Sequence, residues 1–85
     1  MTMPVERTRS VIQTGDFLRE LSKSQQIPER LRLEAARLLR HYPEPGLLLH
    51  AGWLDEVIHS TEPGDPRREL AISGYPELFS SSLDE

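Results

Sequence analysis

Three histidines at regular intervals are the first side chains in this sequence that could bind a metal ion. His41, His50 and His59 stand nine residues apart. At about 100° per residue, nine residues amount to two and a half helical turns, so successive histidines face opposite sides. The chain has no His-x-x-x-His pair and no cysteine, which removes the common zinc-binding patterns. We therefore expect no metal site and no cofactor, and place His41 and His59 in the last turns of helices, where imidazole meets the negative end of the dipole.

A second candidate for chemistry is the pair of Asp55 and His59, which stand four residues apart on one helical face. A carboxylate-oriented base would still need a nucleophile and an oxyanion site. The sequence has no Gly-x-Ser-x-Gly elbow, and its five glycines stand singly, so it also lacks a phosphate-binding glycine loop. We predict that the protein is not an enzyme, and that this pair is a local ion pair.

The basic residues are concentrated in the first half of the chain, where they could contact nucleic acid. Residues 1–40 hold eight basic and five acidic side chains, whereas residues 41–85 hold two basic and nine acidic ones. Guanidinium groups attract phosphates, and the candidate contacts are Arg7, Arg9, Arg30, Arg37 and Arg40. The pI of about 5.3 argues against this function, because most nucleic-acid-binding domains are basic. A solvated arginine-rich face accounts for the same residues.

The elements that must position these groups begin with a helix over about residues 4–23. Thr2 is a candidate N-cap and Pro4 fits the first turn. Gly15 interrupts the helix and is expected to cost about 1 kcal/mol relative to alanine. The predicted apolar stripe consists of Val5, Thr8, Val11, Ile12, Phe17, Leu18 and Leu21.

A second helix is predicted from Pro28, placed at its first position, to Tyr42, where Pro43 ends it. Its apolar stripe consists of Leu31, Ala35, Leu38 and Tyr42, with Leu39 alongside. Because Leu38 is central to this stripe, its replacement by alanine is expected to cost about 2–5 kcal/mol.

The third helix, over about residues 46–59, is apolar on two sides. One stripe consists of Leu47, Ala51, Leu54 and Ile58, and the other of Leu49, Trp53 and Val57. A helix this apolar must be covered on more than one side, either inside the monomer or by a partner. Trp53 is accordingly either a core residue or an interface hot spot. The candidate partner-binding residues are Leu49, Trp53, Val57 and Glu56, and we expect a homodimer or an obligate partner with Trp53 near the centre.

A short fourth helix is predicted from the N-cap Asp65 and Pro66 to about Ile72, followed by Gly74. Residues 75–79 could add one more turn, and residues 80–85 are expected to form a disordered tail. No alternating pattern predicts a strand. The expected fold is all-α, a small helical bundle of three main helices and a short C-terminal helix, with residues 1–79 as a single domain.

Composition limits the class of protein. The 85 residues are 36% hydrophobic and 28% charged, with a net charge of −4, which is typical of one small globular domain. No apolar run exceeds three residues, so we expect no membrane span. The first residues lack the apolar core of a signal peptide. The expected location is the cytoplasm.

Two stretches carry a resemblance to other proteins. They are P-V-E-R-T-R at residues 4–9 and L-L-R-H-Y-P at residues 38–43. On these stretches the first half of the chain resembles a group of short proteobacterial proteins of unknown function. Gly15 stands where a charged residue is expected in that group. The resemblance implies a cytosolic bacterial protein and implies no activity, catalytic residue or ligand.

Taken together, these patterns favour a small non-catalytic helical module that binds a protein, or regulates one, through an apolar helix surface. The alternative is a nucleic-acid-associated regulator that uses the arginine-rich first half. A chromosomal regulator and a phage- or defence-related inhibitor fit the sequence equally well.

Overall fold

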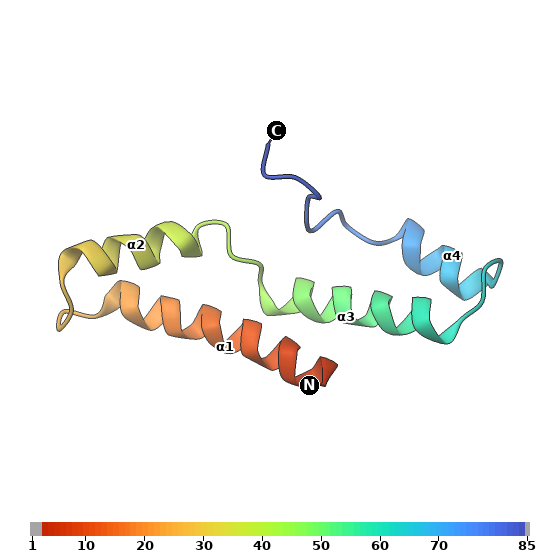
Figure 1. The fold of residues 1–85 in the computed structure, drawn as a ribbon, viewed down its shortest axis with the longest axis horizontal. Helices are drawn as coiled ribbons and strands as arrows, with labels where there is room; N and C mark the ends of the chain where they lie inside the picture. The colour runs from red at the N-terminus through yellow and green to blue at the C-terminus, as the bar shows by residue number, and fades with distance from the viewer. Residues whose placement is uncertain (1–2, 85) are drawn as a thin grey trace. The chain divides into compact units, whose positions relative to one another are not determined.

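The computed structural model describes residues 3–84, and this part of the chain contains four α-helices and no strand (Figure 1). The helices are α1 (Pro4–Lys23), α2 (Glu29–Leu39), α3 (Pro45–Ser60) and the short α4 (Pro66–Ser73). The predicted all-α class is confirmed. The chain divides into two compact units, Met1–Glu44 and Pro45–Glu85, and each is described by itself below. The single domain expected over residues 1–79 stays a prediction.

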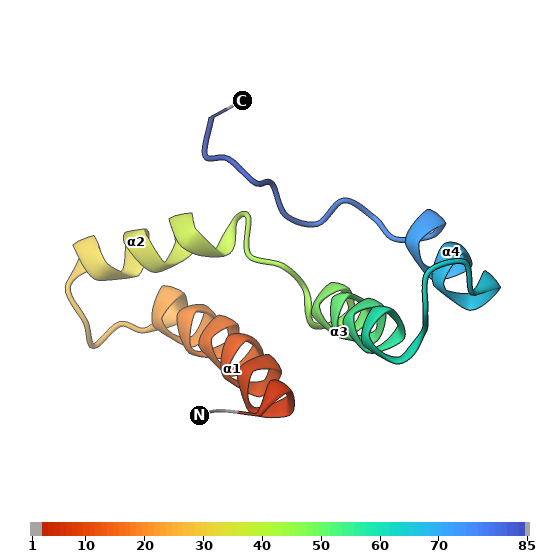
Figure 2. The same ribbon diagram turned by 45° about the vertical axis from the view of Figure 1, so that its right-hand side comes forward.

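The first unit is a helical hairpin in which α1 and α2 lie side by side (Figure 1, Figure 2). Its turn is fixed by polar contacts: the Ser24 hydroxyl accepts the amide of Gln26 at 3.2 Å, and Arg32 donates to the Ser24 carbonyl at 3.3 Å. The buried residues of the two helices are both small, Gly15 on α1 and Ala35 on α2. Small side chains at these positions allow the hairpin to pack closely.

Gly15 has a packing role that the sequence did not show. The ring of Tyr42 covers it, and a Cβ built on Gly15 would lie only 2.6 Å from Cε1 of that ring. The Tyr42 hydroxyl donates a hydrogen bond to the carbonyl of Val11, which holds the ring over α1. The expected loss of helix propensity at Gly15 is therefore accompanied by a contact that a larger residue would obstruct.

The second helix differs from its prediction at both ends. Pro28 is the N-cap with extended ψ of 142°, so Glu29 is the first helical residue. The helix ends at Leu39, and Tyr42 lies in a following turn in which its amide donates to the Leu39 carbonyl at 3.1 Å. His41 consequently lies beyond the helix rather than in its last turn. The steric restriction that Pro43 places on Tyr42 does not by itself set the end of the helix. The helix ends at Leu39, and the ring of Tyr42 packs on α1 instead of continuing α2.

Several residues of the predicted apolar stripes are exposed, namely Val5, Val11, Phe17, Leu31, Leu38 and Leu47. Leu38 is 44% exposed, because it lies at the edge of the packed face that Ala35 centres. The expected 2–5 kcal/mol for Leu38→Ala is therefore too large, since much of the side chain stays in water. Phe17, assigned to the α1 stripe, is 57% exposed. It stands two residues after Gly15, about 200° round α1, and so faces away from α2.

The second unit pairs α3 with the short α4 (Figure 2). The Asp65 carboxylate accepts the amide of Arg67 at 2.8 Å, which confirms the predicted N-cap. It also pairs with the Arg67 side chain, and these bonds hold the pKa of the Asp65 carboxyl below its usual value. Ala71 is buried and anchors α4.

Side chains complete the C-terminal end of α3, whose last carbonyls have no partner within the helix. The Thr61 hydroxyl donates to the Val57 carbonyl at 2.6 Å. The half-buried Arg68, from α4, donates to the carbonyls of Ile58 and Thr61 at 3.0 and 2.9 Å. One guanidinium therefore ties the loop and the end of α3 to α4.

The two ends of the described chain differ from their predictions in the N-cap of α1 and in residues 75–79. Met3 is the N-cap of α1 and makes no side-chain capping bond, and the proposed cap Thr2 lies outside the described residues. The extra turn considered for residues 75–79 does not form, because none of these residues is helical. The tail predicted over residues 80–85 is described as far as residue 84, where it contains no helix.

Candidate protein-binding surface

One side of α3 carries two exposed large apolar side chains, Leu49 and Trp53, among small and polar residues. We call this side the α3 ridge; its residues are Gly46, Leu49, Trp53, Glu56 and Ser60. They recur at intervals of three and four residues and so lie on one helical face. Leu49 is 57% exposed and Trp53 is 48% exposed. Val57, also predicted to bind a partner, lies half-buried beside the ridge. All four predicted partner-binding residues therefore belong to this surface or to its edge.

Trp53 is held in place by a second ring. The centroids of Trp53 and His50 lie 5.7 Å apart with the rings tilted by 50°. His50 in turn meets the edge of Tyr75 at 5.6 Å, where the chain leaves α4. Such aromatic contacts are worth about 0.5–1.5 kcal/mol beyond the buried area. The indole is thus supported on one side by His50, and about half of its surface is exposed.

The short α4 leaves the ridge uncovered. Only Ala71 of its apolar residues is buried, whereas Leu70 and Ile72 are 73% and 50% exposed. On α3, the stripe of Ala51, Leu54 and Ile58 is half-buried. The two apolar stripes of α3 differ in part: Ala51, Leu54 and Ile58 are half-buried, whereas Leu49 and Trp53 are exposed, and so is Leu47 of the first stripe at 37%.

Two histidines, His50 and His59, lie on α3. The Nδ1 of His59 lies 2.7 Å from the backbone carbonyl of Asp55, so the predicted ion pair with the carboxylate is wrong. A protonated Nδ1 donating to this carbonyl explains the geometry. Glu56 and His59 have the Glu-x-x-His spacing of some metal sites. Residues 3–84 nevertheless contain no group of three potential metal ligands.

The arginines of the nucleic-acid alternative do not form one surface. Arg7 and Arg9 are two residues apart on α1, and therefore face opposite sides of that helix. Arg30 and Arg37 do share a face of α2, but Glu34 lies between them.

Glu34 reduces the positive charge of that α2 face. The Nε of Arg37 lies 3.1 and 3.2 Å from its two carboxylate oxygens. The hydrogen bond from Arg37 and the charge of Arg30 hold the pKa of Glu34 below its usual value. The fifth arginine, Arg40, is the C-cap of α2. The five candidate arginines are therefore distributed over several faces of α1 and α2 and do not form one phosphate-binding surface.

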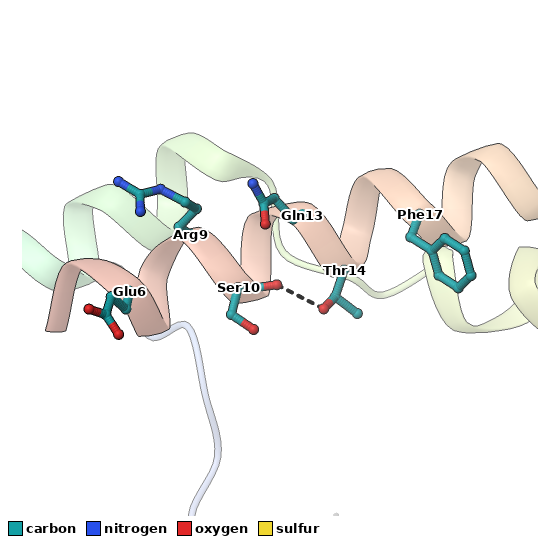
Figure 3. Close-up of a pocket in the computed structure, with 6 residues that line it drawn as sticks. All are labelled: Glu6, Arg9, Ser10, Gln13, Thr14 and Phe17. Atoms are coloured by element: carbon teal, nitrogen blue, oxygen red, sulfur yellow. Dashed lines mark hydrogen bonds between the residues drawn. The ribbon is translucent and has the colours of Figure 1, made fainter. Parts of the chain in front are cut away.

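A shallow depression follows the outer side of α1 (Figure 3). It is lined by Glu6, Arg9, Ser10, Gln13, Thr14 and Phe17. The Thr14 hydroxyl donates a hydrogen bond to the Ser10 carbonyl at 2.8 Å. Because every lining residue comes from one helix, the depression has no opposite wall and cannot enclose a small molecule as ligand pockets do.

No described helix is both long and apolar enough to span a membrane. No protein-family model, curated protein or solved structure is significantly similar to this chain.

Proposed function

We propose that this protein is a small, non-catalytic helical module that binds another protein through the α3 ridge, with Trp53 as the anchoring side chain. The observation that carries the proposal is the exposed, positioned indole in the middle of an apolar helix face. On the resemblance of its first half to short proteobacterial proteins, we place this activity in the bacterial cytoplasm.

The energy available at the ridge supports this proposal. A tryptophan side chain buries about 150–250 Å² when fully covered, and Trp53 keeps about half of its surface exposed. At about 25 cal/mol per Å², covering the rest contributes about 2–3 kcal/mol. Leu49 adds a further apolar contact one turn away. Glu56, at the charged edge, favours specificity more than affinity.

Trp53→Glu is expected to abolish capture of the partner from a lysate of the native host, because it places a charge at the centre of the contact. Leu33→Glu is the matched control, since Leu33 is also an exposed apolar side chain, 60% accessible against 48% for Trp53, but lies on α2. Captured proteins would be compared by mass spectrometry among the wild type and the two variants. Circular dichroism verifies that both variants are helical. Capture of the same proteins by folded Trp53→Glu would contradict the proposal.

A further inference from the structure

We propose that Tyr75, in the segment that follows α4, is a positioning residue for the α3 ridge: it holds Trp53 in its exposed orientation by supporting His50. The inference rests on the proposed function, because it concerns the anchoring side chain of the same surface. It adds that the orientation of this side chain depends on how the segment after α4 docks on α3.

The helix by itself gives the indole of Trp53 little support. Long side chains of an α-helix point toward its N-terminus, onto the residues three and four positions earlier, and for Trp53 these are His50 and Leu49. Leu49 is itself 57% exposed, so little packing fixes its position. The ring of His50, whose centroid lies 5.7 Å from that of Trp53, is therefore the main support of the indole.

His50 needs a support of its own, and α3 does not provide it. The same rule directs the imidazole back toward Leu47 and Gly46. Gly46 has no side chain, and a Cβ built there meets nothing within 4 Å; Leu47 is 37% exposed. His50 is nevertheless half-buried. The ring that meets it, in an edge-to-face contact with a centroid distance of 5.6 Å, is that of Tyr75.

The contacts of α4 place Tyr75 beside His50. Arg68, in the first turn of α4, donates to the Ile58 carbonyl near the C-terminal end of α3, and α4 runs back along α3 from there (Figure 2). Where α4 ends, the Tyr75 amide donates to the Ile72 carbonyl at 3.2 Å, which fixes the backbone that carries the ring. The half-buried side chain of Tyr75 therefore reaches His50 because α4 is docked at its other end.

The strength of an aromatic contact sets the expected effect. A contact of this kind changes the balance between two orientations of a side chain by roughly two- to tenfold. Without the Tyr75 ring, His50 can take other rotamers, and the indole of Trp53 loses its support. A partner that covers the indole must then order it, so binding through Trp53 should weaken by a similar factor.

The orientation of the indole can be followed directly, because Trp53 is the only tryptophan in the chain. Time-resolved fluorescence anisotropy of the full chain separates fast motion of the indole from tumbling of the protein. The tryptophan bands of the near-ultraviolet circular dichroism spectrum report how fixed its surroundings are. Tyr75→Ala and His50→Ala should increase the fast component by similar amounts and weaken these bands. Tyr75→Phe, which keeps the ring, should behave as the wild type.

A double variant shows whether Tyr75 acts through His50. In a His50→Ala background, Tyr75→Ala should cause no further change, because the connection between the rings is already lost. Phe79→Ala is the matched control, since it removes a 65% exposed aromatic side chain from the same segment, and it should leave both signals unchanged. Far-ultraviolet circular dichroism verifies helix content. If Tyr75→Ala unfolds α4, Tyr75→Leu, which keeps an apolar side chain without a ring, takes its place.

An unchanged indole signal in a folded Tyr75→Ala or Tyr75→Leu variant would overturn the proposal. A further loss of order on replacing Tyr75 in the His50→Ala background would also overturn it, because Tyr75 would then act through the fold of α4 and not through His50.

This inference and the proposed function fail separately. An indole that is indifferent to Tyr75 would refute the positioning role and leave capture of a host protein through Trp53 intact. Capture of the same host proteins by Trp53→Glu would refute the binding surface and leave the positioning of the indole standing.

Discussion

Gly15→Ala is expected to destabilise the first hairpin by about 1–2 kcal/mol, although alanine is the better helix former. The new methyl group would lie 2.6 Å from the Tyr42 ring, so the ring must move and lose its packing and its bond to Val11. That loss exceeds the roughly 1 kcal/mol that alanine gains within a helix. Urea denaturation followed by circular dichroism measures the change.

Two comparisons isolate this contact. Gly52→Ala on α3 should stabilise by about 0.5–1 kcal/mol, because a Cβ there meets nothing within 4 Å. In a Tyr42→Ala background, Gly15→Ala should also become stabilising, since the obstructing ring is gone. If Gly15→Ala were stabilising in the wild-type background, the Tyr42–Gly15 contact would not be the packing element described above.

Arg68→Ala should destabilise the unit formed by α3 and α4 by about 2–3 kcal/mol. Its guanidinium donates to the carbonyls of Ile58 and Thr61, and hydrogen bonds from charged groups contribute about 1.5–3 kcal/mol each before partial exposure is considered. The loop and the end of α3 would both lose their connection to α4. Thermal melts followed by circular dichroism should show a lower midpoint and a lower helix content.

The neighbouring arginine supplies the control. The Arg67 side chain is 76% exposed and pairs with Asp65 at the surface, where ion pairs contribute little. Arg67→Ala should therefore leave the midpoint nearly unchanged. Equal effects of the two substitutions would mean that the bonds of Arg68 do not hold α3 and α4 together.

The helices could be predicted well because their signals are local. Proline at the first turn and the Asp65 cap fixed the starts of α1 and α4. The bounds of α1 agree with the prediction to the residue, and those of α3 and α4 within one residue. The end of α2 was missed because it depends on Tyr42 reaching across to α1. That contact joins residues far apart in sequence, and periodicity carries no information about it.

The direction of packing was harder to predict than helicity. Phe17 and Leu38 fit an apolar stripe by spacing, yet the hairpin packs on the small residues Gly15 and Ala35 instead. Spacing assigns residues to a face, whereas the close approach of two backbones decides which face is buried.

The fluorescence of Trp53, the only tryptophan in the chain, tests the central claim that the α3 ridge is an open binding surface. Acrylamide quenching would be measured on the dilute protein alone and again after addition of the partner captured from the host lysate. We predict strong quenching of the protein alone and a loss of quenching, with a blue-shifted emission, when the partner covers the ridge. An indole already protected from acrylamide in the dilute monomer would contradict the account, because Trp53 would then be covered by its own chain.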